Sequence, residues 1–216
     1  MNKVQRLAYL TVIVPVSVVL TEVTFAFRRR GHHHVEPGTI IVSNHVHDFD
    51  SLALVRVFWP TILRFNSQTS NFEIPVAGLI LRAFGTIPVD PAEVGRFFSV
   101  NARALDDGEC VVIYPEGRIT SYGTSTETFH PGAFALAVRT GAPIVPVALV
   151  PSGRNLGVRW RRPQLEAKVG PAMYAKETLP RRQAREELRQ RAEDFVSRAL
   201  DEAARTHRGE SVGVSR

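Results

Sequence analysis

Two histidines and two aspartates lie close together in one short segment of the chain. His45, His47, Asp48 and Asp50 fall within six residues, between an apolar run and an amphipathic run. This pattern predicts a strand that ends in a polar turn and is followed by a helix. Side chains of these types in a turn can act as a general base and its partner, bind a metal ion, or cap the helix.

A histidine–aspartate pair is the first interpretation. If His45 ends the strand and Asp50 lies in the first helical turn, the chain can fold back so that the carboxylate meets one ring nitrogen. The carboxylate then fixes the tautomer and stabilises the imidazolium, which leaves the other nitrogen as a base. The chain has no G-x-S-x-G motif. We therefore expect the base to act on a substrate hydroxyl that attacks an acyl donor directly.

A metal site is the second interpretation. The spacing of His45, His47 and Asp50 resembles a cluster of nitrogen and oxygen ligands, as in a metal-dependent hydrolase. Hydrolases with an H-x-H-x-D-H motif continue with an aspartate and a third histidine, whereas Phe49 and Asp50 stand at those places here. We expect no metal site. In the third interpretation, Asp48 or Asp50 caps the helix and the histidines are incidental.

A second polar turn follows another apolar run. Residues 109–114 predict a buried strand, and Glu116, Gly117 and Arg118 come directly after it. Predicted strands alternate with predicted helices along the chain, which indicates an α/β fold with a mixed, largely parallel central sheet flanked by helices. The polar turns after parallel strands meet at one end of the sheet. We therefore expect His45, Asp50, Glu116 and Arg118 to lie near each other.

The chain begins with a long apolar segment. Residues 7–27 are mostly apolar and number 21, and spanning a bilayer takes about 20 residues. Three arginines at 28–30 follow the segment and favour keeping the rest of the chain in the cytosol. The segment can span the bilayer, dip into one leaflet, or be a buried helix of the domain. We expect membrane association, with the catalytic domain at the cytoplasmic face.

Three regions follow from these patterns. We expect an N-terminal membrane-associated helical segment with a basic linker over 1–35, a catalytic domain over 36–205, and a disordered tail over 206–216. The apolar helix expected over 74–84 is buried or faces lipid or an acyl chain. The strand expected over 143–150 contains two prolines, which favour a sheet edge or a bulge.

Composition limits the function further. The formal net charge is +6, which suits an anionic membrane surface or substrate. The arginines are scattered, and no nucleic-acid recognition motif is present, so we expect no nucleic-acid partner. The single cysteine excludes an intrachain disulfide.

Four sequence blocks, in order, carry a family resemblance. They are N-H-x-x-x-x-D at 44–50, Y-P-E-G-R-I-T at 114–120, G-A-F-A-L-A at 132–137 and A-P-I-V-P-V at 142–147. The chain resembles the glycerolipid acyltransferases of the lysophosphatidate acyltransferase family over roughly residues 36–170. That family has an N-H-x-x-x-x-D block followed by an F-P-E-G block, then similar helix and strand blocks.

The resemblance implies a reaction and assigns roles to residues. His45 would be the general base, and Asp50 would orient it. Asn44, Glu116, Gly117 and Arg118 would bind the substrate. The acyl donor would be acyl-CoA or acyl-carrier protein as a co-substrate, with no further cofactor, and the acceptor would be the hydroxyl of a lysophosphatidate or a related lysolipid in the membrane.

The chain departs from the family where cations are usual. Pro91 follows Asp90 where the family has an arginine, and His130-Pro131 stands where it has a lysine. Arg82, Arg96 or the basic loop over 154–162 could substitute for these cations. A related lysolipid or aminolipid acceptor is therefore one alternative, and a non-catalytic membrane-binding member of the fold is another.

Overall fold

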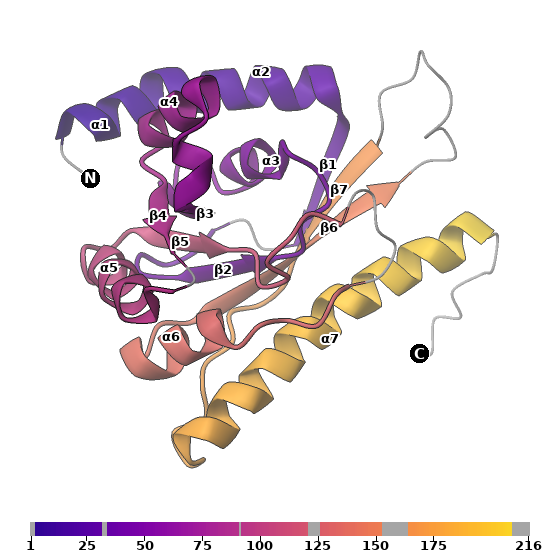
Figure 1. Cartoon of the computed structure of the whole chain (residues 1–216). Helices are drawn as coiled ribbons and strands as arrows, with labels where there is room; N and C mark the ends of the chain where they lie inside the picture. The colour runs from indigo at the N-terminus through magenta and orange to yellow at the C-terminus, as the bar shows by residue number, and fades with distance from the viewer. Residues whose placement is uncertain (1–2, 32–33, 91, 121–125, 153–163, 209–216) are drawn as a thin grey trace.

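The chain folds around one central sheet (Figure 1). The structure is a computed structural model that describes residues 3–31, 34–90, 92–120, 126–152 and 164–208. Its described strands form a seven-stranded sheet in the order β1-β7-β6-β2-β5-β3-β4. The strands are β1 (Ala26–Gly31), β2 (Ile40–Ser43), β3 (Leu63–Gln68), β4 (Ile87–Val89), β5 (Cys110–Ile113), β6 (Ile144–Ser152) and β7 (Gln164–Val169).

Every neighbouring pair of these strands is parallel except β6 and β7. This confirms the predicted α/β fold with a mixed, largely parallel sheet. The helices are α1 (Lys3–Ala8), a π-helical turn η1 (Tyr9–Ile13), α2 (Val14–Thr24), α3 (Asp50–Val57), a 3₁₀ turn η2 (Thr69–Phe72), α4 (Pro75–Ala83), α5 (Val94–Asp106), α6 (Gly132–Thr140) and α7 (Arg181–Arg208).

The two central strands are apolar on both faces because helices cover both faces of the sheet. Along β2, Ile41 packs into the core shared with α2 and α3, whereas Ile40 and Val42 pack into the core shared with α5, α6 and α7. Along β5, the side chains alternate between the two cores in the same way. A strand buried on both faces reads as a continuous apolar run rather than an alternating one, which is why both strands could be predicted.

The order of the strands creates a crevice between β2 and β5. The chain leaves β2 into α3, on one face of the sheet, and leaves β5 into α6, on the other face. The connections therefore diverge where the two neighbouring strands end. In open α/β sheets, ligands bind in the crevice at such a switch point, outside the carboxyl ends of the strands.

The strand β6 lies inside the sheet between β2 and β7, which excludes the sheet edge, one of the two places expected for a strand with prolines. Pro146 pairs with Val42 of β2 and accepts a hydrogen bond from the Gly170 amide on its other side. The nitrogen of Pro146 faces the β7 side of the strand. The hydrogen-bonded ladder between β6 and β7 begins only at the next residue, Val147. The missing N–H of this proline therefore removes no bond from either ladder.

The N-terminal apolar segment is a nearly continuous helix that packs on α3. Its buried side chains recur at helical spacing, among them Tyr9, Ile13, Ser17 and Thr21. The Tyr9 hydroxyl accepts a hydrogen bond from the Leu63 amide at 3.2 Å, which ties the helix to β3. The π-helical turn precedes Pro15, which has no N–H to continue the regular pattern.

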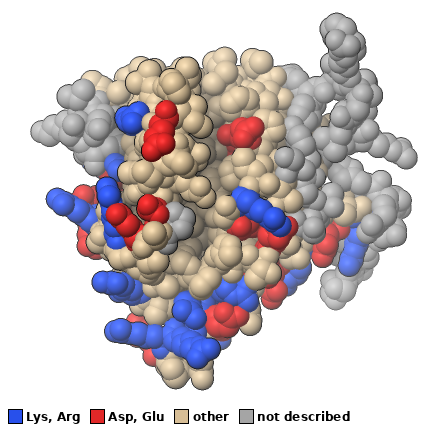
Figure 2. Space-filling model, in the orientation of Figure 1, with Lys and Arg blue, Asp and Glu red and all other residues tan. Residues whose placement is uncertain are grey.

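The opposite face of this helix is apolar and exposed. The helical residues from Arg6 to Thr24 are long and apolar enough to cross a membrane, by length and composition. On α4, which was expected to be buried or to face lipid, only Gly78 is buried. Figure 2 shows mostly uncharged surface over α2. The exposed apolar side chains of these helices and their flanks are Leu7, Val12, Val16, Val19, Leu20, Val23, Ile74, Val76, Leu79 and Ile80.

Both ends of the predicted domain differ from the expected boundaries. The three arginines at 28–30, expected in a linker, lie in β1, which pairs with β7 at the edge of the sheet. At the other end, α7 continues to Arg208 and includes the start of the predicted disordered tail. Residues 209–216, the rest of that tail, lie outside the described residues.

Candidate active site

The His45 ring and the Asp50 carboxylate are in contact. His45 lies two residues beyond β2, and Asp50 is the first residue of α3. The distance from His45 Nδ1 to Asp50 Oδ2 is 2.9 Å. With the proton on Nδ1, the ring donates to the carboxylate, and Nε2 is left as an acceptor on a side chain that lines a cavity. This is the arrangement in which a carboxylate sets the tautomer of a basic histidine.

The same carboxylate also shapes the turn. Asp50 is fully buried, and its Oδ2 accepts hydrogen bonds from the backbone amides of Val46 at 2.6 Å and His47 at 3.0 Å. Asp50 Oδ1 is buried and has no hydrogen-bond partner among the described residues. Asp50 thus fixes both the backbone after His45 and the ring of His45.

Tyr114 is a site residue that sequence reasoning did not single out. Its ring stacks on the His45 ring, with centroids 4.1 Å apart and planes 14° from parallel. Its hydroxyl lies 3.3 Å from the Ser51 hydroxyl at the start of α3. Burial raises the pKa of Tyr114 well above its ordinary value, and the nearby Asp50 charge raises it further. The position was visible in the sequence only as the first residue of the Y-P-E-G block.

Two hydrogen bonds join the two polar turns. The His45 amide donates to Glu116 Oε2 at 3.3 Å, and the Thr120 amide donates to the His45 carbonyl at 2.7 Å. Glu116 is buried, which raises the pKa of its carboxyl, and the hydrogen bond from His45 partly offsets this effect. The structure therefore brings together the residues that topology predicted to be neighbours.

Asn44 turns into the protein rather than toward the cavity. Its amide nitrogen donates to the Leu149 carbonyl at 2.9 Å, and its amide oxygen accepts from the Leu149 amide at 2.8 Å. Asn44 is 1% exposed. The Asn44 side chain therefore pairs with the backbone N–H and C=O of one residue of β6, as a neighbouring strand would. This pairing holds the start of the His45 turn against the sheet.

Gly117 and Arg118 both line the cavity. Gly117 has a φ of 70°, a conformation that favours glycine, and a Cβ at this position would lie 3.3 Å from the His130 ring. Arg118 is mostly exposed, and its Nη2 lies 2.5 Å from Glu127 Oε1. The guanidinium is thus held beside the cavity by an acidic partner.

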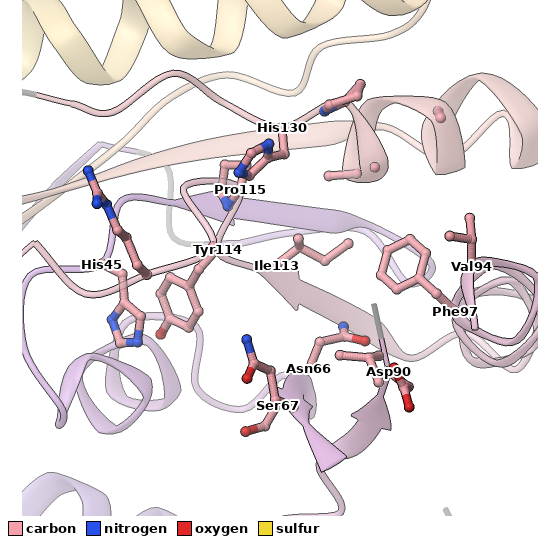
Figure 3. Close-up of a pocket in the computed structure, with 18 of the residues that line it drawn as sticks. His45, Asn66, Ser67, Asp90, Val94, Phe97, Ile113, Tyr114, Pro115 and His130 are labelled. Carbon is pink, nitrogen blue, oxygen red and sulfur yellow. The ribbon is translucent and has the colours of Figure 1, made fainter. Parts of the chain in front are cut away.

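The cavity beside His45 has a volume of about 850 Å³. Figure 3 shows His45 at one end and Val94 and Phe97 of α5 at the other, with Tyr114 and Ile113 between them. His130 lies on one side of the cavity, and Asn66, Ser67 and Asp90 lie on the opposite side. The cavity therefore combines a histidine, an apolar end and two polar sides, which suits an amphiphilic ligand.

The residues proposed for the metal interpretation have other contacts. His47 Nδ1 accepts a hydrogen bond from the Phe49 amide at 3.1 Å, and the His47 ring packs edge-on against Phe25 at 5.0 Å. In the described part of the chain, no group of three histidine, cysteine or acidic side chains is placed to hold a metal ion.

The fold and the site together define an α/β protein with a histidine–aspartate pair at the switch point of its sheet, beside a cavity for an amphiphilic ligand. The acyltransferase family profile matches residues 26–150 of the chain, more than half of its length. The chain belongs to the acyltransferase family, which confirms the resemblance predicted from the four sequence blocks.

Relatives of known name agree with this assignment. The 1-acyl-sn-glycerol-3-phosphate acyltransferase of Pseudomonas aeruginosa is 30% identical over 203 residues, which cover 86% of this chain and 74% of that protein. A chloroplastic 1-acyl-sn-glycerol-3-phosphate acyltransferase of Brassica napus is 30% identical over 118 residues, or 53% of this chain and 33% of that protein. The human alpha enzyme of the same name is 31% identical over 126 residues, or 56% and 44%.

A solved structure has the same fold. The crystal structure of the 1-acyl-sn-glycerophosphate acyltransferase PlsC from Thermotoga maritima superimposes with a TM-score of 0.70. The match covers 91% of this chain and 80% of that chain, at 19% sequence identity. The chain is therefore an acyltransferase by family and a PlsC-like α/β protein by fold.

Proposed function

We propose that the protein transfers a fatty acyl group from an acyl thioester, either acyl-CoA or acyl-carrier protein, to the free hydroxyl of lysophosphatidate. The contact between His45 and Asp50 beside the cavity is the observation that carries the proposal. The names of the relatives support the acceptor, because each is a 1-acyl-sn-glycerol-3-phosphate acyltransferase. The reaction belongs to phospholipid biosynthesis.

The reaction follows from the histidine–aspartate geometry. His45 Nε2 removes the proton of the acceptor hydroxyl as its oxygen attacks the thioester carbonyl, while Asp50 stabilises the imidazolium through Nδ1. The tetrahedral intermediate then collapses, the carbon–sulfur bond breaks, and the imidazolium proton passes to the thiolate. The products are the ester and the free thiol of the donor. Arg118 lines the same cavity and can stabilise negative charge on the reacting groups.

The other predicted site residues support this reaction from the second turn and from the sheet. Glu116 holds the backbone amide of His45, and Gly117 lines the cavity next to Arg118. Asn44 positions the turn through Leu149. We therefore assign direct substrate contact to Gly117 and Arg118, and a positioning role to Asn44 and Glu116.

The N-terminal helix is proposed to hold the enzyme on the membrane. One of its faces packs on α3, and the opposite face exposes side chains such as Val19 and Val23. A helix that is attached to the domain along one face cannot cross the bilayer without carrying the domain into it. We therefore place the helix in the plane of one leaflet. The arginines of β1 then lie near the lipid head groups, with the catalytic domain at the cytoplasmic face.

Substitution of His45 tests the proposed function. Purified wild-type protein in detergent–lipid micelles should convert lysophosphatidate and acyl-CoA, or acyl-carrier protein, to phosphatidate and free thiol. The His45→Ala variant should lose about 10²- to 10⁴-fold in kcat, because it removes the general base. The melting temperature and circular dichroism spectrum report whether the variant folds.

The matched control is His34→Ala, because His34 is exposed and does not line the cavity. This variant should keep wild-type activity. Turnover by His45→Ala at the wild-type rate would refute the role of the histidine. Lipid binding by the wild type without thioester cleavage would instead identify a non-catalytic member of the fold.

A further inference from the structure

A second arginine lines the cavity from a different element. Arg185, on the second turn of α7, contributes to the cavity wall, although it lies more than sixty residues after Arg118 in the sequence. Its side chain is partly buried. The Nε atom of Arg185 is buried and has no hydrogen-bond partner among the described residues.

The neighbouring arginine on the same helix is fully paired. Arg189, one turn further along α7, is held by Glu186 at 2.7 Å and by Glu193. Arg185 forms no comparable ion pair within the described part of the chain. Glu186 and Glu193 therefore hold Arg189 by hydrogen bonds, whereas Arg185 interacts with the charge of Glu186 without a hydrogen bond to it among the described residues.

The lack of a hydrogen-bond partner for Arg185 Nε among the described residues matters, because an unpaired guanidinium in a partly buried place is unfavourable. It carries five N–H donors in a planar fork that matches the oxygens of a phosphate or carboxylate. A buried donor without a partner is costly, and a bound anion would remove that cost. Of the two arginines on the cavity wall, Arg118 already has Glu127 as a partner, so Arg185 is better placed to bind an anionic ligand.

The wall around Arg185 leaves room for such a ligand. Gly132 of α6 has no side chain, Ala133 and Ala135 have small ones, and all three line the cavity. The segment before α6 is attached to α7, because the Phe129 amide donates to Glu193 at 2.9 Å. This attachment places His130 on the cavity wall with Arg185. Asp90 is the only acidic residue that lines the cavity among those described, and it lies on the side opposite His130 (Figure 3).

The cations suggested by the sequence lie elsewhere. Arg82 donates to the Phe72 carbonyl and stacks over the Phe72 ring, and Arg96 pairs with Glu93. Neither lines the cavity. The basic loop over 154–162 lies outside the described residues.

We propose that Arg185 binds the phosphate monoester of the acceptor lipid and selects for acceptors that carry one, with His130 on the same wall. This inference rests on the proposed function. It assigns the phosphate of lysophosphatidate to the side of the cavity formed by α6 and α7. The acceptor hydroxyl then faces His45. The phosphates of acyl-CoA are the other possible source of an anion, and the experiment separates the two.

Steady-state kinetics of the full chain test the assignment. At saturating acyl donor, Arg185→Ala should raise the KM for lysophosphatidate about tenfold to a hundredfold, because it removes a charge-assisted hydrogen bond. The KM for acyl-CoA should stay at its wild-type value, and the melting temperature of the ligand-free variant should not fall, because the substitution removes a buried donor without a partner. Arg185→Lys keeps the charge and loses the planar fork, so its KM should be intermediate.

Two controls complete the test. Arg198→Ala removes another arginine of α7, which is exposed and pairs weakly with Asp194 at 3.8 Å, and it should change neither KM. A monoacylglycerol that lacks the phosphate should be used equally well by the wild type and by Arg185→Ala. An unchanged KM for lysophosphatidate in Arg185→Ala, or an increase confined to acyl-CoA, would overturn the proposal.

Failure of the proposed function would give a different result. The wild type itself would then show no acyl transfer to lysophosphatidate. Equilibrium binding of lysophosphatidate and monoacylglycerol in micelles would still decide the role of Arg185. The variant should bind lysophosphatidate at least tenfold more weakly than the wild type and bind monoacylglycerol equally well. Equal binding of lysophosphatidate by both proteins would refute the inference.

Discussion

The His45 ring is restrained from two directions. Asp50 holds one edge of the ring at 2.9 Å, and Tyr114 stacks on its face with the centroids 4.1 Å apart. The first contact sets the tautomer, and the second limits tilting of the ring. In the proposed reaction, a base that is held in this way would need little reorganisation when the substrate hydroxyl arrives.

Tyr114 should therefore matter through its ring more than through its hydroxyl. The Tyr114→Phe variant keeps the stacked ring and should retain kcat within about threefold. The Tyr114→Leu variant loses the aromatic contact, worth about 0.5–1.5 kcal/mol, and should lose roughly threefold to tenfold in kcat. Initial rates at saturating substrates measure both. A larger loss in Tyr114→Phe than in Tyr114→Leu would show that the hydroxyl is the important group.

Glu116 should make stability depend on pH. Burial raises the pKa of its carboxyl, so the folded state favours the neutral form. Its contribution to stability is fully present below the ordinary pKa of the carboxyl and is lost as the pH rises through the raised value. The Glu116→Gln variant keeps an oxygen acceptor for the His45 amide and cannot ionise.

The melting temperature of Glu116→Gln should therefore rise relative to that of the wild type as the pH increases from about 4 to about 8. Thermal unfolding of both proteins in a pH series measures this difference. A difference that is constant across the series would mean that Glu116 ionises in the folded protein as easily as in the unfolded chain.

The residues of the candidate site come from several helices and strands. The strand β2 and helix α3 carry His45 and Asp50, β5 carries the Glu116 turn, and α6 and α7 form the wall with Arg185. The Asn44 side chain connects the first of these turns to β6 through two hydrogen bonds. The position of His45 therefore depends on a strand that contributes no residue to the cavity wall.

Asn44→Ala should loosen this connection. It leaves the buried N–H and carbonyl of Leu149 without partners, at a cost of roughly 1–3 kcal/mol for each group. Urea unfolding should show this loss of stability, and kcat should fall with it. Asn44→Asp is the matched comparison, because the carboxylate can accept from the Leu149 amide but cannot donate to its carbonyl, and it places a charge at a buried position. Its loss should be at least as large, and equal stability of Asn44→Ala and wild type would contradict the anchoring role.

The elements were predictable from the sequence to different degrees. The strands β2 and β5 could be predicted because burial on both faces produces a continuous apolar run. The helix α6 could be predicted because a proline precedes it and a glycine follows it. The strand β1 could not, because Arg28, Arg29 and Arg30 belong to an edge strand whose side chains are mostly exposed. Its strand conformation comes from pairing with β7, more than a hundred residues away in the sequence.

The whole molecule has one apolar side and one charged side. The surface over α2 is mostly uncharged, whereas charged side chains gather over the lower half of the molecule in Figure 2. Contiguous exposed apolar surface is uncommon on a soluble monomer and marks a contact with lipid or protein. The proposed orientation places this side in the leaflet and the catalytic cavity within reach of membrane lipids.

Charges on the apolar side should release the protein from vesicles. Val19 and Val23 are 59% and 65% exposed on the proposed lipid face of α2. The double variant Val19→Glu with Val23→Glu should lose about 1.5–3 kcal/mol of binding for each valine, and hence at least tenfold in its partition coefficient. Sedimentation with phosphatidylglycerol-containing vesicles measures the coefficient. Tyr174→Glu is the control, because Tyr174 is 57% exposed outside these helices. Equal release by both variants would argue against the proposed lipid face.

The sequence by itself determined the fold class, the family and the pairing of His45 with Asp50. These depend on short-range patterns, because the histidine and the aspartate are only five residues apart and the two polar motifs each follow the end of a strand. The tertiary structure decided which distant residues complete the site. The ring of Tyr114 on His45, the inward turn of Asn44 toward Leu149, and the place of Arg185 on the cavity wall each join parts of the chain that are far apart in sequence. Such contacts depend on strand order and helix packing, and these leave no mark on the local pattern of residues.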